Sequence, residues 1–487
     1  MSSWRHLTPF MKQCFVTTGV ALNIGGGATV MAFVTGMLPQ LKDSTSGIYV
    51  DDAIGSWIAA TPSMCLLIGN LITPTLMSIF GRKITNIISI TIVIIGWLCL
   101  AIAEDITLIL FARILQGVSM GMALNLGPIL IAEYTSPVNR GAFLMFMSVL
   151  TATGVLVTHT IGSYFSWQLN ATVCMVLAFL NLLIVLYSPE SPAWLADNGR
   201  YDDCSKTFRW LRGEHEEIEL NEIIKSSIVH NEAKIRPSAE EPSFSFGFVM
   251  CYIKRNMICR EFYMPIFIMI HVYGIGQWAG INVLSTYTLD VCRNIISFDG
   301  DVAPHIIALD TQRIVSNLAA IIMIRKFKRR TMLFSITSLG ILVMLVTAGY
   351  TYAKSKNLMP FDHPYLGVLL IHLHMFTVAS CTISLPYIIA GEIFPLKYKG
   401  VAGGISILFF SLHFSVVVKT VPYLFNTLGI YGAYCMYAGI VAYCLLVTVI
   451  FLPETKDRTL QDIANDFRCT KLHLKSLESE TEILCNT

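Results

Sequence analysis

Two opposite charges stand inside an apolar stretch that is long enough, with its neighbours, to cross a bilayer. The stretch LDTQRIVSNLAAIIMI (309–324) contains Asp310 and Arg313, and each charge near the middle of a membrane helix costs about 2.5–3.5 kcal/mol on insertion scales. Helical spacing puts Asp310, Arg313 and Asn317 on one face. The pattern therefore predicts a polar stripe along one face of this span.

The composition indicates a protein that crosses the membrane many times. Of the 487 residues, 54% are hydrophobic and 14% are charged, whereas soluble domains carry about 25% charged residues. The net charge of +2 suggests no nucleic-acid partner. The thirteen cysteines show no metal-ligand spacing, so we expect neither a metal nor another cofactor. The polar N-terminus lacks a signal-peptide pattern, so we expect the first apolar run to remain as a span.

Twelve apolar runs have the length of about 20 residues that suits a hydrocarbon core of about 30 Å. They predict an all-α membrane protein with twelve transmembrane helices in two six-helix bundles. The predicted domains are an N-terminal bundle (1–187), a cytosolic loop with short helices (188–262), a C-terminal bundle (263–452) and a cytosolic tail (453–487). The predicted spans are 14–38, 53–79, 87–103, 107–132, 142–166, 169–187, 263–288, 303–324, 331–353, 366–390, 401–421 and 431–452.

Lysine and arginine are unevenly divided between the two sides of this topology. With both termini in the cytosol, 27 of the 34 basic residues fall in cytosolic segments and 4 fall in external loops. Positive residues accumulate on the cytosolic side of membrane proteins. Both termini are therefore predicted to be cytosolic.

The two halves of the chain repeat several short motifs. FGRK (80–83) recurs as FKRR (327–330), and PILIAEYTSPVNRG (128–141) recurs as PYIIAGEIFPLKYKG (386–400). SPES recurs in the same way as LPET before the tail. Two parallel six-span halves with a site between them are the architecture of a major facilitator transporter.

Eight motifs, in this order along the chain, resemble those of the sugar porter branch of the major facilitator superfamily. Two further stretches, 51–59 and 418–434, are similar to insect transporters of trehalose and hexoses. The eight motifs are FGRK (80–83), RILQG (113–117), E-x6-RG (133–141), PESPAWL (189–195), FRWLRG (208–213), QWAGIN (277–282), GEIFP (391–395) and PETKDRTL (453–460).

The resemblance implies a charge network at the cytosolic edge. Ion pairs between the two bundles would hold the inside closed while the outside is open, although each exposed pair contributes only about 0–1 kcal/mol. An alternative is that the basic residues determine topology alone. The predicted gate residues are Arg82, Lys83, Glu133, Arg140, Glu190, Arg329, Arg330, Glu392, Lys399 and Glu454.

The resemblance also implies a sugar site at the centre. Sugars are neutral and rich in hydroxyl groups, so they need amide groups and an aromatic face. Gln277, Asn282, Tyr287 and Tyr387 match family positions for these groups. Several usual partners are missing, because the first glutamine of the family motif is Gly276 here. Gln277 and Asn282 could alternatively serve helix packing.

Three interpretations of Asp310 and Arg313 follow. Counting along the span puts Arg313 where the family has a sugar-binding asparagine, so the resemblance implies that the stripe faces a wet central cavity, where water relieves part of the cost of the charges. In the first interpretation the two charges neutralise each other and, with Asn317, form a polar wall for a neutral sugar. In the second, Arg313 binds an anionic group of the substrate. In the third, the charges clamp another span and do not contact substrate.

We expect a facilitative uniporter for trehalose or a hexose in the plasma membrane, acting as a monomer. Family proton symporters carry an acidic residue in the first span, but residues 13–39 contain none. Arg313 is expected to keep Asp310 ionised, and histidines within spans, such as His159, are expected to be hydrogen-bonded helix residues. The alternatives are a transporter of an anionic or modified polyol and a transport-inactive sugar sensor. No enzyme signature is present.

Overall fold

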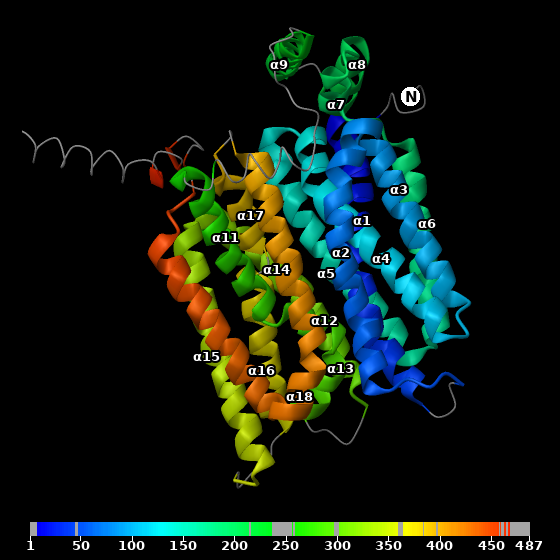
Figure 1. Ribbon diagram of the computed structural model, residues 1–487, viewed down its shortest axis with the longest axis vertical. Coiled ribbons are helices and arrows are strands. Elements are labelled where there is room, and N and C mark those ends of the chain that lie inside the picture. The colour runs from blue at the N-terminus through cyan, green and yellow to red at the C-terminus, as the bar shows by residue number, and fades with distance from the viewer. Residues whose placement is uncertain are drawn as a thin grey trace, which may run out of the picture.

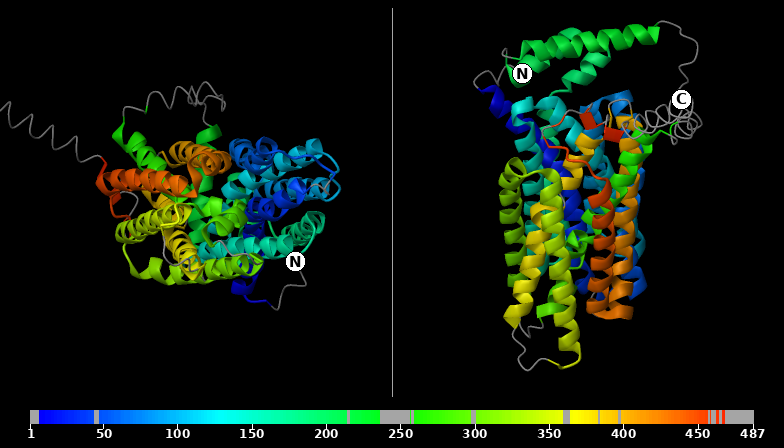
Figure 2. Two further views of the ribbon diagram at one scale, coloured as in Figure 1. Left: turned by 90° about the horizontal axis from the view of Figure 1, so that it is seen from below. Right: turned by 90° about the vertical axis from the view of Figure 1, so that its left-hand side faces the viewer.

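The computed structural model describes residues 7–43, 47–213, 216–235, 256, 259–296, 301–358, 364–382, 384–395, 398–456, 458, 462–463 and 466–467. Within these ranges every regular element is a helix. Figure 1 shows two bundles side by side, which we call the N-half and the C-half, and the view from below in Figure 2 agrees. The predicted all-α membrane fold is confirmed.

Six long helices form the N-half, and three shorter helices follow it. The short helices lie beyond one end of the bundles (Figure 1), which we call the α7–α9 end; the other is the opposite end. The N-half contains α1 (Pro9–Lys42), α2 (Asp52–Phe80), α3 (Arg82–Ala101), α4 (Ile106–Tyr134), α5 (Pro137–Tyr164) and α6 (Trp167–Tyr187). The short helices are α7 (Pro192–Asp197), α8 (Tyr201–Arg212) and α9 (Glu217–Ile235).

The C-half contains more interrupted helices. Its elements are α11 (Arg260–Trp278), α12 (Ile281–Thr286), α13 (Thr288–Ile296), α14 (Ala303–Lys326), α15 (Arg329–Ser355), α16 (Pro364–Thr377), a π-helical turn (Val378–Thr382), α17 (Ser384–Ile393) and α18 (Lys399–Phe451).

Eleven helices of the described chain are long and apolar enough to span a membrane. The last of them, α18, contains two crossings: Figure 1 shows its ribbon turning back, and the backbone is non-helical at Gly429, where φ is 68° and ψ is 171°. A positive φ of this kind is accessible to glycine at little cost. Together these helices give the twelve crossings that the apolar runs predicted.

Glycine decides how closely α2 and α4 pack. A Cβ atom on Gly121 would lie 2.2 Å from the carbonyl oxygen of Leu66, and one on Gly69 would lie 2.1 Å from that of Val118. Any larger residue would therefore collide with backbone. Small residues at such contacts let membrane helices approach closely and gain van der Waals packing.

The predicted span 263–288 is not one continuous helix. It breaks between α11 and α12 at Gly280, which has a left-handed φ of 98°. The side chain of His374 lies against this break, since a Cβ on Gly280 would be 3.2 Å from its ring. The break fixes the relative positions of Gln277 and Asn282.

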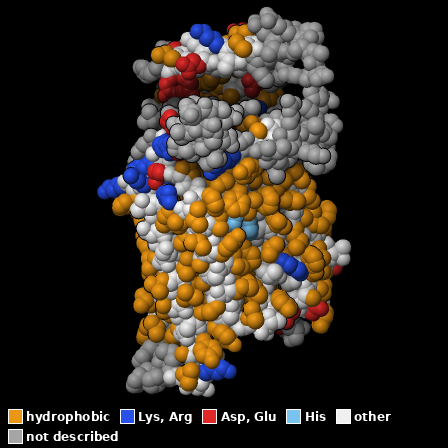
Figure 3. All heavy atoms as spheres, turned by 60° about the vertical axis from the view of Figure 1, so that its left-hand side comes forward, with side chains coloured by type: hydrophobic (Ala, Val, Ile, Leu, Met, Phe, Trp, Pro, Cys, Tyr) orange, Lys and Arg blue, Asp and Glu red, His pale blue; other side chains and the backbone are white. Residues whose placement is uncertain are grey.

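The outer surface suits a bilayer. Figure 3 shows hydrophobic side chains covering the middle of the molecule, with many of the charged side chains nearer its ends. The halves meet through α2 with α18, α5 with α14, and α1 with α12.

Candidate transport site and the contacts between the halves

Gln277 and Asn282 lie together on the two sides of the Gly280 break. The Asn282 side-chain nitrogen donates to the Gln277 side-chain oxygen, and the Gln277 side chain is buried. The neighbouring Trp278 indole donates to His413 Nδ1 over 3.1 Å. The structure thus brings the two predicted amide residues into one hydrogen-bonded pair at a point where the helix is interrupted.

A cavity of about 480 Å³ opens between the halves near the opposite end. Its wall carries charges of both signs together with hydroxyl and amide groups, and the predicted site residue Tyr287 lines it. The Tyr287 hydroxyl donates to the Val418 carbonyl at 3.2 Å. The polar and charged lining residues are Thr35, Lys42, Asp43, Asp52, Ser56, Thr286, Asp290, Arg293, Asn294 and Asn426.

Asp290 is a carboxylate of the cavity wall whose pKa is shifted by its surroundings. Although Asp290 keeps contact with the cavity, the surrounding protein removes part of its hydration, and this raises the pKa of its carboxyl. The positive charges of Lys42 and Arg293 oppose that shift.

Tyr387 and Asn317 occupy different places from the amide pair. Tyr387 is 39% exposed, and its ring centroid lies 5.8 Å from that of Phe410. Asn317 donates to the Ser148 carbonyl at 3.1 Å, which joins α14 to α5. The predicted substrate residues are therefore spread between the C-half interior and the interface of the halves.

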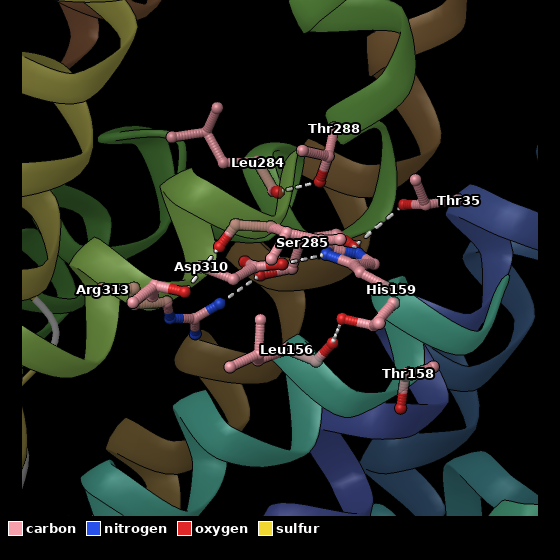
Figure 4. Close-up of polar contacts among 12 residues, drawn as sticks. Thr35, Leu156, Thr158, His159, Leu284, Ser285, Thr288, Asp310 and Arg313 are labelled. Atoms are coloured by element: carbon pink, nitrogen blue, oxygen red, sulfur yellow. Dashed lines mark hydrogen bonds and ion pairs between the residues drawn. The ribbon is translucent and has the colours of Figure 1, made fainter. Parts of the chain in front are cut away.

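Asp310 and Arg313 do not form the mutual ion pair that the first of the three interpretations requires. Asp310 Oδ2 lies 2.6 Å from His159 Nδ1 on α5, and Arg313 Nη1 donates to Ser285 Oγ at 2.9 Å (Figure 4). Both charged side chains are buried, and neither lines the cavity. The first interpretation is thus wrong in its pairing, because side chains that share a helix face can still reach partners on different neighbouring helices.

These contacts connect the two halves, and they lie toward the opposite end. His159 is five residues from the end of α5, and Asp310 is seven residues from the start of α14. The other nitrogen of His159, Nε2, is 3.0 Å from the Ser285 carbonyl oxygen. The Thr35 hydroxyl donates to the carbonyls of Ser285 and Thr286 at 3.2 and 3.0 Å.

Lys419 makes a further connection at the opposite end. Its Nζ donates to Ser56 Oγ on α2 at 2.6 Å and lies 3.8 Å from the centre of the Trp57 ring. Sequence reasoning assigned no role to Lys419 or Thr35. A lone lysine in an apolar span was the available signal, since such a residue needs a polar or aromatic partner.

The predicted gate residues of the N-half bond to one another. Arg82 and Glu133 form an ion pair at 3.1 Å. Glu190 Oε1 accepts from the backbone N–H groups of Arg82 and Lys83, both at 3.0 Å. These groups open α3, where backbone donors lack helical partners. A Cβ on Gly81 would lie 2.5 Å from Glu190, so glycine admits the carboxylate.

The C-half repeats this arrangement. Arg329 pairs with Glu392 at 3.6 Å, and Glu454 accepts from the backbone N–H groups of Arg329 and Arg330 at 3.0 and 3.1 Å. Thr455 Oγ1 donates to Glu392 at 2.6 Å. The motif repeat therefore corresponds to a repeated three-dimensional contact.

Among the described residues, the predicted latch between bundles is not observed. Arg82 and Arg329 each pair inside their own half, and Arg140 donates to the Ala132 carbonyl at 2.9 Å. Glu190 and Glu454, which the motifs associate with these arginines, lie beside the starts of α3 and α15. Each carboxylate therefore bonds within its own bundle. The side chain of Lys399 lies outside the described part of the chain.

The comparison with protein families identifies the chain. The model for "Sugar (and other) transporter" matches residues 15–467. The chain belongs to this family. It is thus a multi-pass sugar transporter of the major facilitator superfamily and not an enzyme, and the predicted resemblance to the sugar porter branch is confirmed.

The most similar relatives of this family member include insect proteins. It is 26% identical over 467 residues to the facilitated trehalose transporter Tret1 of Culex quinquefasciatus, covering 93% of this chain and 86% of that protein. It is 27% identical to that of Apis mellifera ligustica, covering 90% and 84%. For the Aedes aegypti protein, the 26% identity covers 93% of this chain but 56% of the relative.

Solved structures support the same fold. The proton:xylose symporter XylE bound to 6-bromo-6-deoxy-D-glucose matches with a TM-score of 0.75 at 18% identity, over 94% of this chain and 100% of that chain. An inward-open conformation of XylE from E. coli matches with a TM-score of 0.71 at 18% identity, over 94% and 99%. Similarity at this level of identity shows the architecture of the transporter.

Proposed function

We propose that this transporter is a uniporter that carries trehalose or a hexose across the plasma membrane by alternating access, acting as a monomer. The cavity between the halves is the observation that carries the proposal. Its volume of about 480 Å³ lies within the range of about 300–1,000 Å³ that is usual for small-molecule sites. Hydroxyl, amide and charged groups line it from both halves, as a ligand rich in hydroxyls requires.

The short helix α12 links this cavity to the amide pair. Thr286 and Tyr287 line the cavity at one end of α12, and Asn282 lies near the other end beside Gln277. We therefore assign substrate binding to Gln277, Asn282 and Tyr287, with Tyr387 as the aromatic face. A neutral sugar would move from the cavity to these groups as the halves rotate.

The orientation proposed here places the α7–α9 end in the cytosol, with both termini. The count of basic residues supports it, with 27 of 34 in the segments assigned to that side. The cavity then opens toward the outside. The repeated contacts of Glu190 and Glu454 would brace each half at its cytosolic edge during rotation.

The positions and partners of the charged residues support uniport of a neutral substrate. The first-span residues 13–39 contain no aspartate or glutamate. Arg313 donates to Ser285 inside the protein and is not part of the cavity wall, so it does not offer the guanidinium that an anionic polyol would need. Two cations, Lys42 and Arg293, line the cavity, and so do three aspartates, Asp43, Asp52 and Asp290. The positive charges of the wall are therefore balanced by negative ones.

Transport by the full-length protein in liposomes tests the proposal. We expect saturable uptake of labelled trehalose or glucose that is unaffected when a proton ionophore is added at equal pH on both sides. Uptake of a labelled sugar acid instead would favour the anionic polyol. A correctly folded protein that moves none of the three would favour the sensor.

A pair of variants tests the assigned site. Gln277→Ala removes the amide partner of Asn282, and the loss of hydrogen bonds worth about 1–2 kcal/mol should lower uptake about tenfold. Gln312→Ala is the matched control, because Gln312 donates to the His372 carbonyl within the C-half. Equal losses in both variants would remove Gln277 from the site.

A further inference from the structure

His159 and Asp310 form a buried contact between the halves that the transport of a neutral sugar does not explain. Their side chains are 0% and 1% exposed, and His159 Nδ1 lies 2.6 Å from Asp310 Oδ2. Figure 4 shows the histidine ring between the carboxylate and the Ser285 backbone, whose carbonyl oxygen is 3.0 Å from Nε2. Both ring nitrogens are thus in hydrogen bonds.

The partners of this ring determine how many protons the pair holds. A backbone carbonyl can only accept, and an ionised carboxylate can only accept, whereas a neutral imidazole has a single N–H. Two such bonds need two protons. They are present if His159 is an imidazolium beside an aspartate, or if a neutral His159 accepts from a protonated Asp310. Either form carries one proton more than neutral histidine plus ionised aspartate.

The other groups around the pair are compatible with the extra proton. Asp310 Oδ1 has no hydrogen-bond partner among the residues that the structure describes, and a buried carboxylate with an unbonded oxygen is costly. Arg313 of α14 is the nearby cation, and it donates to Ser285 Oγ on α12. Cys292 of α13 interacts electrostatically with Asp310. From α1, Thr35 donates to the same Ser285 carbonyl that His159 contacts.

We propose that His159 and Asp310 are a proton-binding site that closes the opposite end of the interface between the halves. The proposal rests on the alternating access described above. His159 belongs to the N-half, whereas Asp310 and Ser285 belong to the C-half, so opening this end separates them. Water then reaches His159, and the proton is released to the outer side, from which it was also taken up.

This linkage gives the transporter a dependence on external pH without net proton transport. Closure takes up one proton, so low pH favours the closed opposite end and high pH favours the open one. A single linked proton changes the ratio of closed to open protein by up to about tenfold per pH unit.

A distance measurement across the opposite end tests the proposal without any sugar. Spin labels are attached to Tyr49→Cys and Tyr365→Cys, whose native side chains are 81% and 82% exposed and belong to the N-half and the C-half. The full-length protein, with its reactive native cysteines replaced by serine, is placed in lipid nanodiscs. Pulsed electron spin resonance then records the distance between pH 5 and pH 8.5. We expect a short distance at low pH and a growing population of longer distances as pH rises.

Variants show whether this pair is responsible. His159→Gln and Asp310→Asn should each remove the pH dependence of the distance, whereas His271→Gln should keep it. His271 is a buried histidine that bonds to the Phe267 carbonyl of its own helix at 2.9 Å. A wild-type distance that does not change with pH overturns the proposal even if a variant fails to fold. So does an unchanged pH dependence in both interface variants. Because no sugar is present, the result is independent of whether trehalose is transported.

Discussion

At the opposite end, hydrogen bonds from Thr35, His159 and Lys419 cross from one half to the other. At the α7–α9 end, Arg82 and Arg329 form ion pairs inside their own halves. These polar groups tie the halves together at the opposite end, whereas the arginine–glutamate pairs stiffen each half separately. Between the two ends, the Asn317–Ser148 and Asn70–Ser411 bonds also cross from one half to the other. In the proposed orientation the opposite end faces outward. The contacts between the halves then close the transporter on its outer side, and the cavity is a vestibule that opens to the outside.

The two ends also differ in how well their charges are hydrated. The His159–Asp310 contact is fully buried, whereas the side chains of Arg82 and Glu133 are 18% and 15% exposed. Opening the opposite end must break this buried contact before water can reach its two partners. An accessible pair can exchange its partner for water. Rotation of the halves should therefore be limited by the opposite end.

The largest effect is expected from Asp310→Ala. It leaves His159 buried without its carboxylate partner, and breaking a buried pair costs about 3 kcal/mol or more. Thermal unfolding of the purified protein should show a clearly lower midpoint. Asp52→Ala is the control, because the Lys42–Asp52 ion pair has side chains that are 42% and 72% exposed. A similar midpoint for both variants would contradict the view that the opposite end holds the halves together.

A smaller loss is expected from Glu190→Ala and Glu454→Ala. Each carboxylate accepts from two backbone N–H groups at the start of a long helix, α3 or α15. Losing such a cap costs about 1–2 kcal/mol, so each variant should melt earlier by a similar amount. Glu222→Ala, on the exposed side of α9, should leave the midpoint unchanged. If only one of these two variants melts earlier, the repeated contacts do not contribute equally to the stability of the two halves.

The sequence indicated which residues gather at the α7–α9 end better than it indicated the contacts at the opposite end, although it assigned the former to ion pairs between the bundles. The contacts of Glu190 and Glu454 follow short motifs that occur in both halves, and they satisfy backbone groups at helix starts, so local rules suffice. His159 and Asp310 are 151 residues apart. Nothing in either span indicates that distant partner, because helical spacing reveals which side chains share a face and not which helix lies opposite.

The seventh span is present over Arg260–Thr286, and the same limit explains why its interruption was not predicted. Residues 263–288 are mostly apolar and their pattern predicts one helix, yet Gly280 adopts φ of 98° and separates α11 from α12. An isolated glycine in a helical pattern is usually tolerated. The break depends on packing against His374, which bonds to the Ala279 carbonyl at 2.8 Å. That contact comes from another span and is invisible in the local sequence.

Lys419→Met should loosen the opposite end by a modest amount. The substitution keeps most of the side-chain volume but removes the bond to Ser56 and the charge over the Trp57 ring. A cation over an aromatic ring contributes about 0.5–1 kcal/mol at accessible sites, so the fraction open at this end should rise about two- to fivefold. The spin-label distance between positions 49 and 365 measures it. An unchanged distribution would exclude Lys419 from the contacts that close this end.

The smallest expected effect is the coupling between Arg82 and Arg329. Each arginine bonds to a glutamate of its own half, and independent sites have additive free energies of unfolding to within about 0.5 kcal/mol. The destabilisation of the double variant Arg82→Ala/Arg329→Ala should therefore equal the sum of the two single effects. A coupling energy well above that value, measured by thermal unfolding of all four proteins, would show that the α7–α9 end is also tied across the halves. The contrast between the two ends would then be a property of one conformation, and the ties at the α7–α9 end would form when the opposite end opens.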